Sequence, residues 1–171
     1  RLLETTKVAP FRFKMTGIER AMLYRLAAET GLRSNELRNL TASSFDLDAC
    51  TVTVKAGYSK HRRQDVLPLR PDTAIELRNF LKDKMPDVKA FNMPSKSRVA
   101  NMLKADLASA TILYCDESGG YADFHALRHT TGSLLAAGGI HPKVAQAIMR
   151  HSDINLTMSR YTHSYRESEV Q

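Results

Sequence analysis

The sequence is poor in cysteine and has no long apolar run, and each absence narrows what the protein can be. Its two cysteines, Cys50 and Cys115, lie far apart, and neither has a second cysteine at C-x-x-C spacing. The chain therefore has no zinc signature and no disulfide framework, which predicts a reducing compartment. No segment is long and apolar enough to span a membrane and no signal peptide is visible, so we expect a cytoplasmic protein without a membrane partner.

What the chain does have is the length of one domain and an excess of positive charge. Its 171 residues suit a single domain with a proper core. The net charge of +7 points to a polyanionic partner, above all nucleic acid, although many basic proteins bind none. Because the chain opens on Arg1 and not on methionine, we expect it to be a fragment of a longer protein with a further N-terminal domain.

Apolar residues recur at helical spacing through most of the chain, and one short region alternates as strands do. Thr16 and Glu19 form a capping box that predicts a helix, and Gly31 stands where that helix would end. Ser34 is expected to cap the next, shorter helix. Alternation between residues 45 and 69 predicts a sheet of about three strands around a basic turn. The fold class is therefore mainly α with a small antiparallel β-sheet. The expected strands are 45–48, 51–55 and 64–69, with a strand end at 111–114, and the expected helices are 16–30, 34–40, 71–86, 95–108, 126–137, 141–149 and 152–161.

Arginine and histidine recur between residues 125 and 161, inside segments that otherwise pattern as packed helices. Buried charge is unfavourable unless it is paired, so this recurrence needs a reason. A negatively charged ligand in a cleft would supply one, since arginine grips phosphate oxygens in bidentate fashion and histidine donates hydrogen bonds or moves protons. A tyrosine hydroxyl would then serve as the nucleophile. The residues concerned are His125, Arg128, His129, Arg150, His151, Arg160, Tyr161 and His163.

These residues belong to a series of five motifs that resembles the catalytic domain of the tyrosine recombinases, the phage-integrase family. Lys60 lies eight residues before Pro68, which is the spacing of the family's catalytic lysine. Tyr161 follows His151 by ten residues, as the nucleophile does in the family. The sequence departs from the pattern at Arg150, where the family more often has glycine. The motifs are 30–37 with Arg33, 59–69 with Lys60, 124–130 with His125 and Arg128, 151–154 with His151, and 160–163 with Tyr161.

The resemblance implies an organisation, an activity and a partner. Residues 16–165 would be a tyrosine recombinase catalytic domain, residues 1–15 a linker arm and residues 166–171 a polar tail. The implied function is site-specific DNA recombination by a bacterial or phage-encoded integrase of a mobile element, which acts in the cytoplasm on double-stranded DNA. Members of the family work as tetramers on DNA, whereas we expect the isolated fragment to be a monomer. No metal, ATP or other cofactor is implied.

The resemblance also implies a role for each matching residue. Tyr161 would attack a DNA phosphodiester and leave a 3′-phosphotyrosine and a 5′-hydroxyl. Arg33 and Arg128 would clamp the non-bridging oxygens, which is a preorganised electrostatic role. Lys60 would protonate the departing 5′-oxygen as general acid. His151 would donate a hydrogen bond to the phosphate, and His125 would support the phosphate or assist proton transfer. Glu36 would orient the arginines, and His129 would have a structural role. Arg62 and Arg63 would position DNA phosphates.

Several alternatives stay open. Lys55 lies at the end of the preceding strand and competes for the role of general acid. His125 and His129 have the i, i+4 spacing that zinc uses, although no third ligand pattern accompanies them. The alternative functions are a type IB topoisomerase-like relaxation of DNA and a DNA-binding module without catalysis, which needs only the positive charge and the basic turn. The rival tyrosines are Tyr58, Tyr121 and Tyr165, and His163 has a second interpretation as a solvated tail residue.

Overall fold

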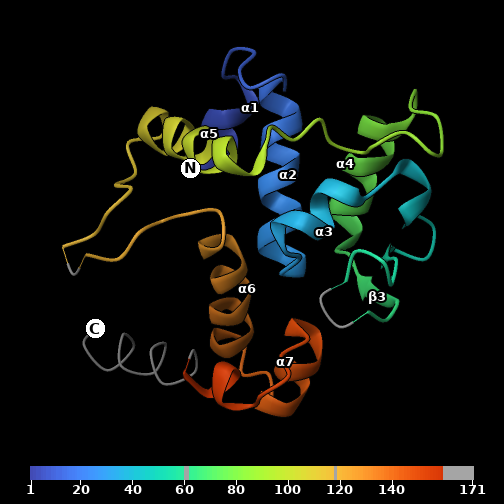
Figure 1. Ribbon diagram of the computed structural model, residues 1–171, viewed down its shortest axis with the longest axis vertical. Coiled ribbons are helices and arrows are strands. Elements are labelled where there is room, and N and C mark those ends of the chain that lie inside the picture. Colours follow the sequence, from blue (N-terminus) through green and yellow to red (C-terminus); the bar gives the residue numbers. More distant parts are fainter. Residues whose placement is uncertain (60–61, 118, 160–171) are drawn as a thin grey trace.

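The computed structural model describes residues 1–59, 62–117 and 119–159, and it is mainly helical with one small sheet (Figure 1). The fold class predicted from the sequence is thereby confirmed. Over these ranges, none of the helices combines the length and the apolar character that crossing a membrane requires. The helices are α1 (Leu2–Lys7), α2 (Gly17–Thr30), α3 (Ser34–Asn39), α4 (Pro71–Leu81), α5 (Lys96–Ser109), α6 (Ala126–Ala137) and α7 (Pro142–Met149), with a 3-10 turn at Ala42–Ser44.

Helix α2 lies at the centre of the molecule and contacts α1, α3, α4 and α6 (Figure 1). It begins as the sequence predicts, because Thr16 Oγ1 accepts a hydrogen bond of 3.1 Å from the backbone nitrogen of Glu19. The Glu19 carboxylate does not complete the capping box, and accepts instead from the backbone nitrogen of Asn92 at 2.6 Å. The helix ends at Gly31, whose φ of 63° is the left-handed conformation that glycine adopts without strain.

Residues 1–15, expected to be a linker arm, contain a helix that packs on the rest of the protein. Helix α1 contacts α2 and α5, and its Leu2 and Leu3 pack against the main core. Its C-terminal end lies so close to the start of α2 that a Cβ on Gly17 would stand 2.3 Å from the carbonyl oxygen of Thr6. Only glycine fits this approach, so the N-terminal segment is docked on the domain.

The sheet has three antiparallel strands in the order β1 (Phe45–Asp46), β2 (Thr51–Val54) and β3 (Asp65–Pro68). In the β2–β3 pair Val52 lies opposite Leu67, and Val54 lies opposite Asp65. Val52, Val54 and Leu67 are buried, so one face of the sheet packs on the core. The connection from β2 to β3, which contains the basic turn predicted from the sequence, is called the hairpin below (residues 55–64).

Two local predictions were wrong, and a third extends beyond the described residues. Arg33, and not Ser34, is the N-cap of α3, because the Glu36 carboxylate reaches back to the Arg33 backbone nitrogen at 2.8 Å. Residues 111–114 form no strand, since no neighbouring strand lies beside them, and a single bridge joins Cys115 to Tyr121. Residues 155–159 are helical, as expected for the last helix, whose predicted continuation to Tyr161 lies outside the described residues.

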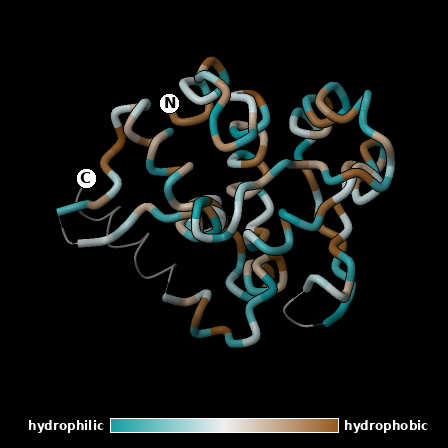
Figure 2. Tube along the Cα trace, turned by 45° about the horizontal axis from the view of Figure 1, so that its top comes forward, coloured by the Kyte–Doolittle hydropathy of each residue, from teal (hydrophilic) through white to brown (hydrophobic). Residues whose placement is uncertain are grey.

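Most buried apolar side chains form one core, and a smaller cluster stabilises the C-terminal helices. The main core is built around α2, with Leu23 and Leu26 fully buried. A second cluster, of Ala136 and Ala145 with two partly buried neighbours, joins α6 to α7. Figure 2 shows hydrophobic and hydrophilic segments alternating along the helices, as expected when each helix buries one face.

Candidate active site

Arg128 on α6 is held at the junction of three elements. Its side chain is buried, with 3% of the residue exposed. One Nη atom donates to the carbonyl oxygen of Gly31 at the end of α2, and the other donates to the carbonyl oxygen of Met149 at the end of α7. Since Gly31 lies two residues before Arg33 and Met149 lies just before Arg150, these two hydrogen bonds bring the three arginines to one place.

Arg33 lies at the start of α3, where Glu36 fixes both its backbone and its side chain. The backbone nitrogen of Arg33 donates to one Glu36 oxygen at 2.8 Å, and Arg33 Nη1 donates to the other at 3.2 Å. The Arg33 side chain keeps 23% of its surface exposed, whereas that of Glu36 keeps 1%. The predicted clamp residue is therefore oriented by a buried carboxylate and remains accessible from solvent.

The family resemblance assigned no role to Arg150. This residue ends α7 with φ 52° and ψ 44°, and its side chain is buried. Its Nη2 donates to Glu36 Oε2 at 2.7 Å, and its Nη1 lies 3.2 Å from Glu36 Oε1 and 3.3 Å from Asp65 Oδ2. The available signal was an arginine directly before His151, at a helix end where glycine is typical.

The charges of this arginine cluster (Arg33, Arg128 and Arg150 with Glu36) are unbalanced. Burial, and then the positive charges of Arg33 and Arg150, lower the pKa of Arg128 to about 10, against an opposing effect of the Glu36 charge. Burial by itself raises the pKa of Glu36, but hydrogen bonds and charge from Arg150 and Arg33 outweigh burial and lower it. Among the residues that the structure describes, no carboxylate forms an ion pair with Arg128. The cluster therefore has the electrostatics of a site for an anion.

His151 follows Arg150 and is oriented by its neighbours. Its Nδ1 lies 3.0 Å from Thr157 Oγ1, and its carbonyl oxygen accepts from Gln146 Nε2 at 3.2 Å. Its backbone nitrogen donates to the carbonyl oxygen of Gln146 at 3.1 Å, which closes the end of α7. The imidazole is half-buried beside the arginine cluster, in the part of the fold where the sequence predicts a hydrogen-bond donor to phosphate.

His125 is the N-cap of α6, and His129 follows Arg128 in the first turn of that helix. Their rings meet edge to face with centroids 4.8 Å apart. His125 is exposed and His129 is half-buried. In the described ranges no third histidine, cysteine or carboxylate completes a group with metal-binding geometry.

Asp65, the first residue of β3, directly follows the hairpin and links it to the cluster. Its Oδ2 accepts from Ser59 Oγ at 3.3 Å as well as from Arg150, and its Oδ1 accepts from Arg63 Nε at 2.9 Å. Arg62 and Arg63, for which the resemblance implies positioning of DNA phosphates, are both exposed. Lys60, the predicted general acid, lies outside the described residues, and its rival Lys55 is exposed at the end of β2.

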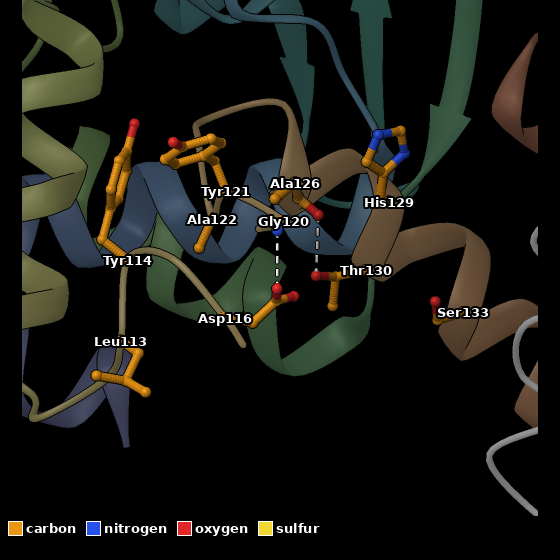
Figure 3. A pocket seen from close by; sticks show the side chains of 10 residues that line it. All are labelled: Leu113, Tyr114, Asp116, Gly120, Tyr121, Ala122, Ala126, His129, Thr130 and Ser133. Atoms are coloured by element: carbon orange, nitrogen blue, oxygen red, sulfur yellow. Dashed lines mark hydrogen bonds between the residues drawn. The ribbon is translucent and has the colours of Figure 1, made fainter. Parts of the chain in front are cut away.

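A pocket of about 530 Å³ lies on the other side of α6, between that helix and the loop before it (Figure 3). Asp116 Oδ1 accepts from Gly120 at 2.7 Å within this loop. The rival Tyr121 lines this pocket, with its ring 5.7 Å from that of Tyr114. None of the three clustered arginines lines it. The tyrosine predicted as nucleophile, Tyr161, lies outside the described residues, as do Tyr165 and His163.

Comparison with protein families and curated proteins places the chain among DNA recombinases. The model of the phage integrase family matches residues 1–168. Tyrosine recombinase XerA of Saccharolobus solfataricus is 26% identical over 148 residues, which are 83% of this chain and 45% of the relative. Tyrosine recombinase XerD of Neisseria meningitidis serogroup A is 25% identical over 155 residues, or 86% of this chain and 51% of the relative. The chain thus spans about half the length of these relatives.

Solved structures of the same kind share the fold. The catalytic domain of bacteriophage HP1 integrase superposes with a TM-score of 0.69 at 24% identity, over 99% of this chain and 88% of that one. XerA recombinase gives a TM-score of 0.73 at 21% identity, over 99% and 59%. The Tn1549 transposon integrase, in complex with transposon right end DNA, gives 0.71 at 19% identity, over 98% and 61%. The fold described above is therefore that of a tyrosine recombinase catalytic domain.

Proposed function

We propose that this chain, which belongs to the phage integrase family, is the catalytic portion of a site-specific DNA recombinase that cleaves and rejoins DNA through a 3′-phosphotyrosine intermediate. The whole protein would act as the integrase of a mobile element on double-stranded DNA, and would assemble as a tetramer there. Relatives named as tyrosine recombinases, and a structural neighbour bound to transposon DNA, support DNA as the partner.

The observation that carries the proposal is the arginine cluster. Arg33 and Arg150 pair there with the carboxylates of Glu36 and Asp65, and Arg128 beside them is held by backbone carbonyls. A phosphate group that receives hydrogen bonds from Arg33 and Arg128 would balance this charge. The same donors would stabilise the further negative charge that develops on the non-bridging oxygens during attack.

The proposed reaction takes its remaining groups from the family resemblance. Tyr161, as the phenolate that nearby cations favour, attacks the phosphorus, and the bond to the 5′-oxygen of the next nucleotide breaks. Lys60 donates the proton that this oxygen needs to leave as a hydroxyl, and His151 donates a hydrogen bond to the phosphate. In the reverse step a 5′-hydroxyl of a second strand displaces the tyrosine. The phosphodiester energy is kept in the covalent intermediate, so the exchange needs no ATP.

The decisive experiment is adduct formation on nicked duplexes that carry candidate sites, resolved by denaturing electrophoresis. Cleavage next to the nick releases a short fragment and traps the covalent complex. We expect a protein–DNA adduct with the unaltered chain and with Tyr121→Phe, and none with Tyr161→Phe, while DNA affinity stays the same in all three. An adduct that persists in Tyr161→Phe would overturn the assignment of the nucleophile. DNA binding without an adduct in any variant would leave a non-catalytic binding module.

A further inference from the structure

The backbone at the end of α7 is unfavourable for the residue that occupies it. Arg150 has φ 52° and ψ 44°, the left-handed conformation in which a Cβ crowds the following carbonyl and glycine is preferred. In the described ranges five other non-glycine residues have positive φ, and one of them, Thr111, likewise lies where a helix closes, directly after the C-cap of α5. An arginine that keeps this conformation needs compensating contacts from its side chain.

The side chain of Arg150 supplies such contacts by bridging two carboxylates from distant parts of the chain. Glu36 receives hydrogen bonds at both oxygens, and Asp65 lies 3.3 Å from the same guanidinium. The Arg150 side chain is 3% exposed, that of Glu36 1% and that of Asp65 10%. These ion pairs are shielded from solvent, so they are directional and poorly screened by salt.

Each carboxylate in turn positions a part of the predicted active site. Glu36 fixes the backbone and the side chain of Arg33. Asp65 accepts from Ser59 and Arg63, which lie on either side of the segment that contains Lys60. Through its own backbone Arg150 is joined to His151. One guanidinium therefore connects the clamp arginine, the hairpin and the motif that contains His151.

We propose that Arg150 is a positioning residue, which sets Arg33 and the hairpin relative to His151 through Glu36 and Asp65. Its effect on catalysis rests on the proposed DNA cleavage, whereas its effect on the hairpin does not. A purely structural ion pair would change the stability of the fold and leave the rate of the folded enzyme unaltered. A positioning residue changes the rate at saturating DNA.

The test compares Arg150→Gly and Arg150→Lys with Arg78→Ala. Glycine relieves the backbone at position 150, so the Gly variant is expected to fold. Lysine keeps the charge but lacks the planar fork that reaches both oxygens of Glu36 and Asp65 together. Arg78 forms a surface ion pair with Asp48 at 2.6 Å, so Arg78→Ala is the matched control that removes an arginine ion pair away from the cluster. Two quantities are measured, amide hydrogen exchange over residues 51–68 and the single-turnover rate of adduct formation at saturating DNA.

We expect Arg150→Gly to raise exchange in residues 51–68 and to slow cleavage by about 100-fold, the size of a loss caused by misplacing reacting groups. DNA affinity stays within about threefold, because the exposed basic residues are intact. Arg150→Lys is intermediate, and Arg78→Ala changes neither quantity. In an Asp65→Asn background the effect of Arg150→Gly on exchange is smaller, since both changes break the same link.

Exchange in residues 51–68 that is identical in Arg150→Gly and the unaltered chain would overturn the proposal, as would a wild-type cleavage rate in that variant. If no variant forms an adduct, and the unaltered chain does not either, the proposed function fails. The exchange measurement still decides the role of Arg150 in that case.

Discussion

Within the part of the chain that the structure describes, arginine is buried in two places, and the two clusters differ in charge balance. Arg20 on α2 is fully buried and donates to both oxygens of Asp106, at 2.7 and 3.1 Å. Tyr24 donates to the same carboxylate at 2.8 Å, and the carbonyl oxygens of Met15 and Pro10 accept from Arg20 Nη1. Burial, and then the charge of Asp106, raise the pKa of Tyr24, so this phenol stays neutral. One positive charge faces one negative charge, and the pair is closed to solvent.

The arginine cluster around Glu36 has the opposite character. It combines three positive charges, those of the arginines, with two negative charges, those of Glu36 and Asp65. The Arg33 side chain is open to solvent. Both clusters bury cations, but only the second has charge left for a ligand. The difference shows that a buried arginine does not by itself indicate a functional site. Positive charge that exceeds the negative charge around it, next to a solvent-accessible side chain such as Arg33, does indicate one. Three substitutions and the addition of inorganic phosphate test this comparison.

The largest effect is expected for Arg20→Met. It leaves Asp106 buried without its cation, and removal of one partner of a buried ion pair destabilises a protein by about 3–5 kcal/mol. The free energy of unfolding, measured with urea, should fall by that amount, whereas cleavage by the protein that remains folded should stay within about twofold. A change below about 1 kcal/mol, or a slow folded enzyme, would contradict the view that this cluster is structural.

Arg33→Ala should have the reverse pattern, a large loss of cleavage rate with little change in stability. Removal of one preorganised donor to a transition-state oxyanion typically slows a reaction by about 10²–10³-fold, or about 2.7–4 kcal/mol of barrier. Glu36 keeps its hydrogen bonds from Arg150, so stability should change by less than about 1 kcal/mol. The single-turnover rate of adduct formation measures the effect, with the exposed Arg70→Ala as control. Equal rates for the two variants would remove Arg33 from the clamp.

Glu36→Gln should weaken the cluster and change its response to acid. At neutral pH the loss of charge-assisted hydrogen bonds should destabilise the fold by about 1.5–3 kcal/mol. The pKa of Glu36 is lowered below its ordinary 4.5 by its arginine partners, so its contribution to stability is present above that value and is lost as pH falls through the folded pKa. Urea unfolding between pH 7 and pH 3 should therefore show a smaller acid loss in Glu36→Gln. An unchanged pH profile would contradict this prediction.

The smallest expected effect is stabilisation by inorganic phosphate. At ten times its dissociation constant, an anion that binds only the folded state adds about 1.4 kcal/mol, which raises the melting temperature by about 3–6 °C for a protein of this size. The shift should shrink in Arg33→Ala and stay intact in Arg70→Ala, with sodium chloride at equal ionic strength as reference. If Arg33→Ala and the unaltered protein respond alike, phosphate binds elsewhere.

Features that depend on neighbouring residues were predictable from the sequence. The cap at Thr16, the stop at Gly31 and the three strands follow local rules of hydrogen bonding and alternation, and all three are observed. The prediction of a strand end at 111–114 was wrong, because a strand needs a neighbouring strand to pair with and its own residues do not specify one. Resemblance, and not spacing, led to Arg33 and Arg128 as a pair.

Arg150 shows what the sequence could not reveal. Its partners lie 114 and 85 positions away, so no local pattern connects them. The departure from the family's glycine was visible, but its consequence depends on where α7, α3 and β3 meet. The catalytic roles assigned from the resemblance stay predictions, and two of the residues concerned, Lys60 and Tyr161, lie outside the described part of the chain.

The two carbonyl oxygens that accept hydrogen bonds from Arg128 tie the arginine cluster to the packing of three helices. These oxygens belong to the last turns of α2 and α7, and α6 and α7 share only a small apolar cluster of their own. A molecule whose C-terminal pair of helices has come away loses the clamp in the same event. The packing that completes the fold is therefore also what brings Arg128 beside Arg33 and Arg150.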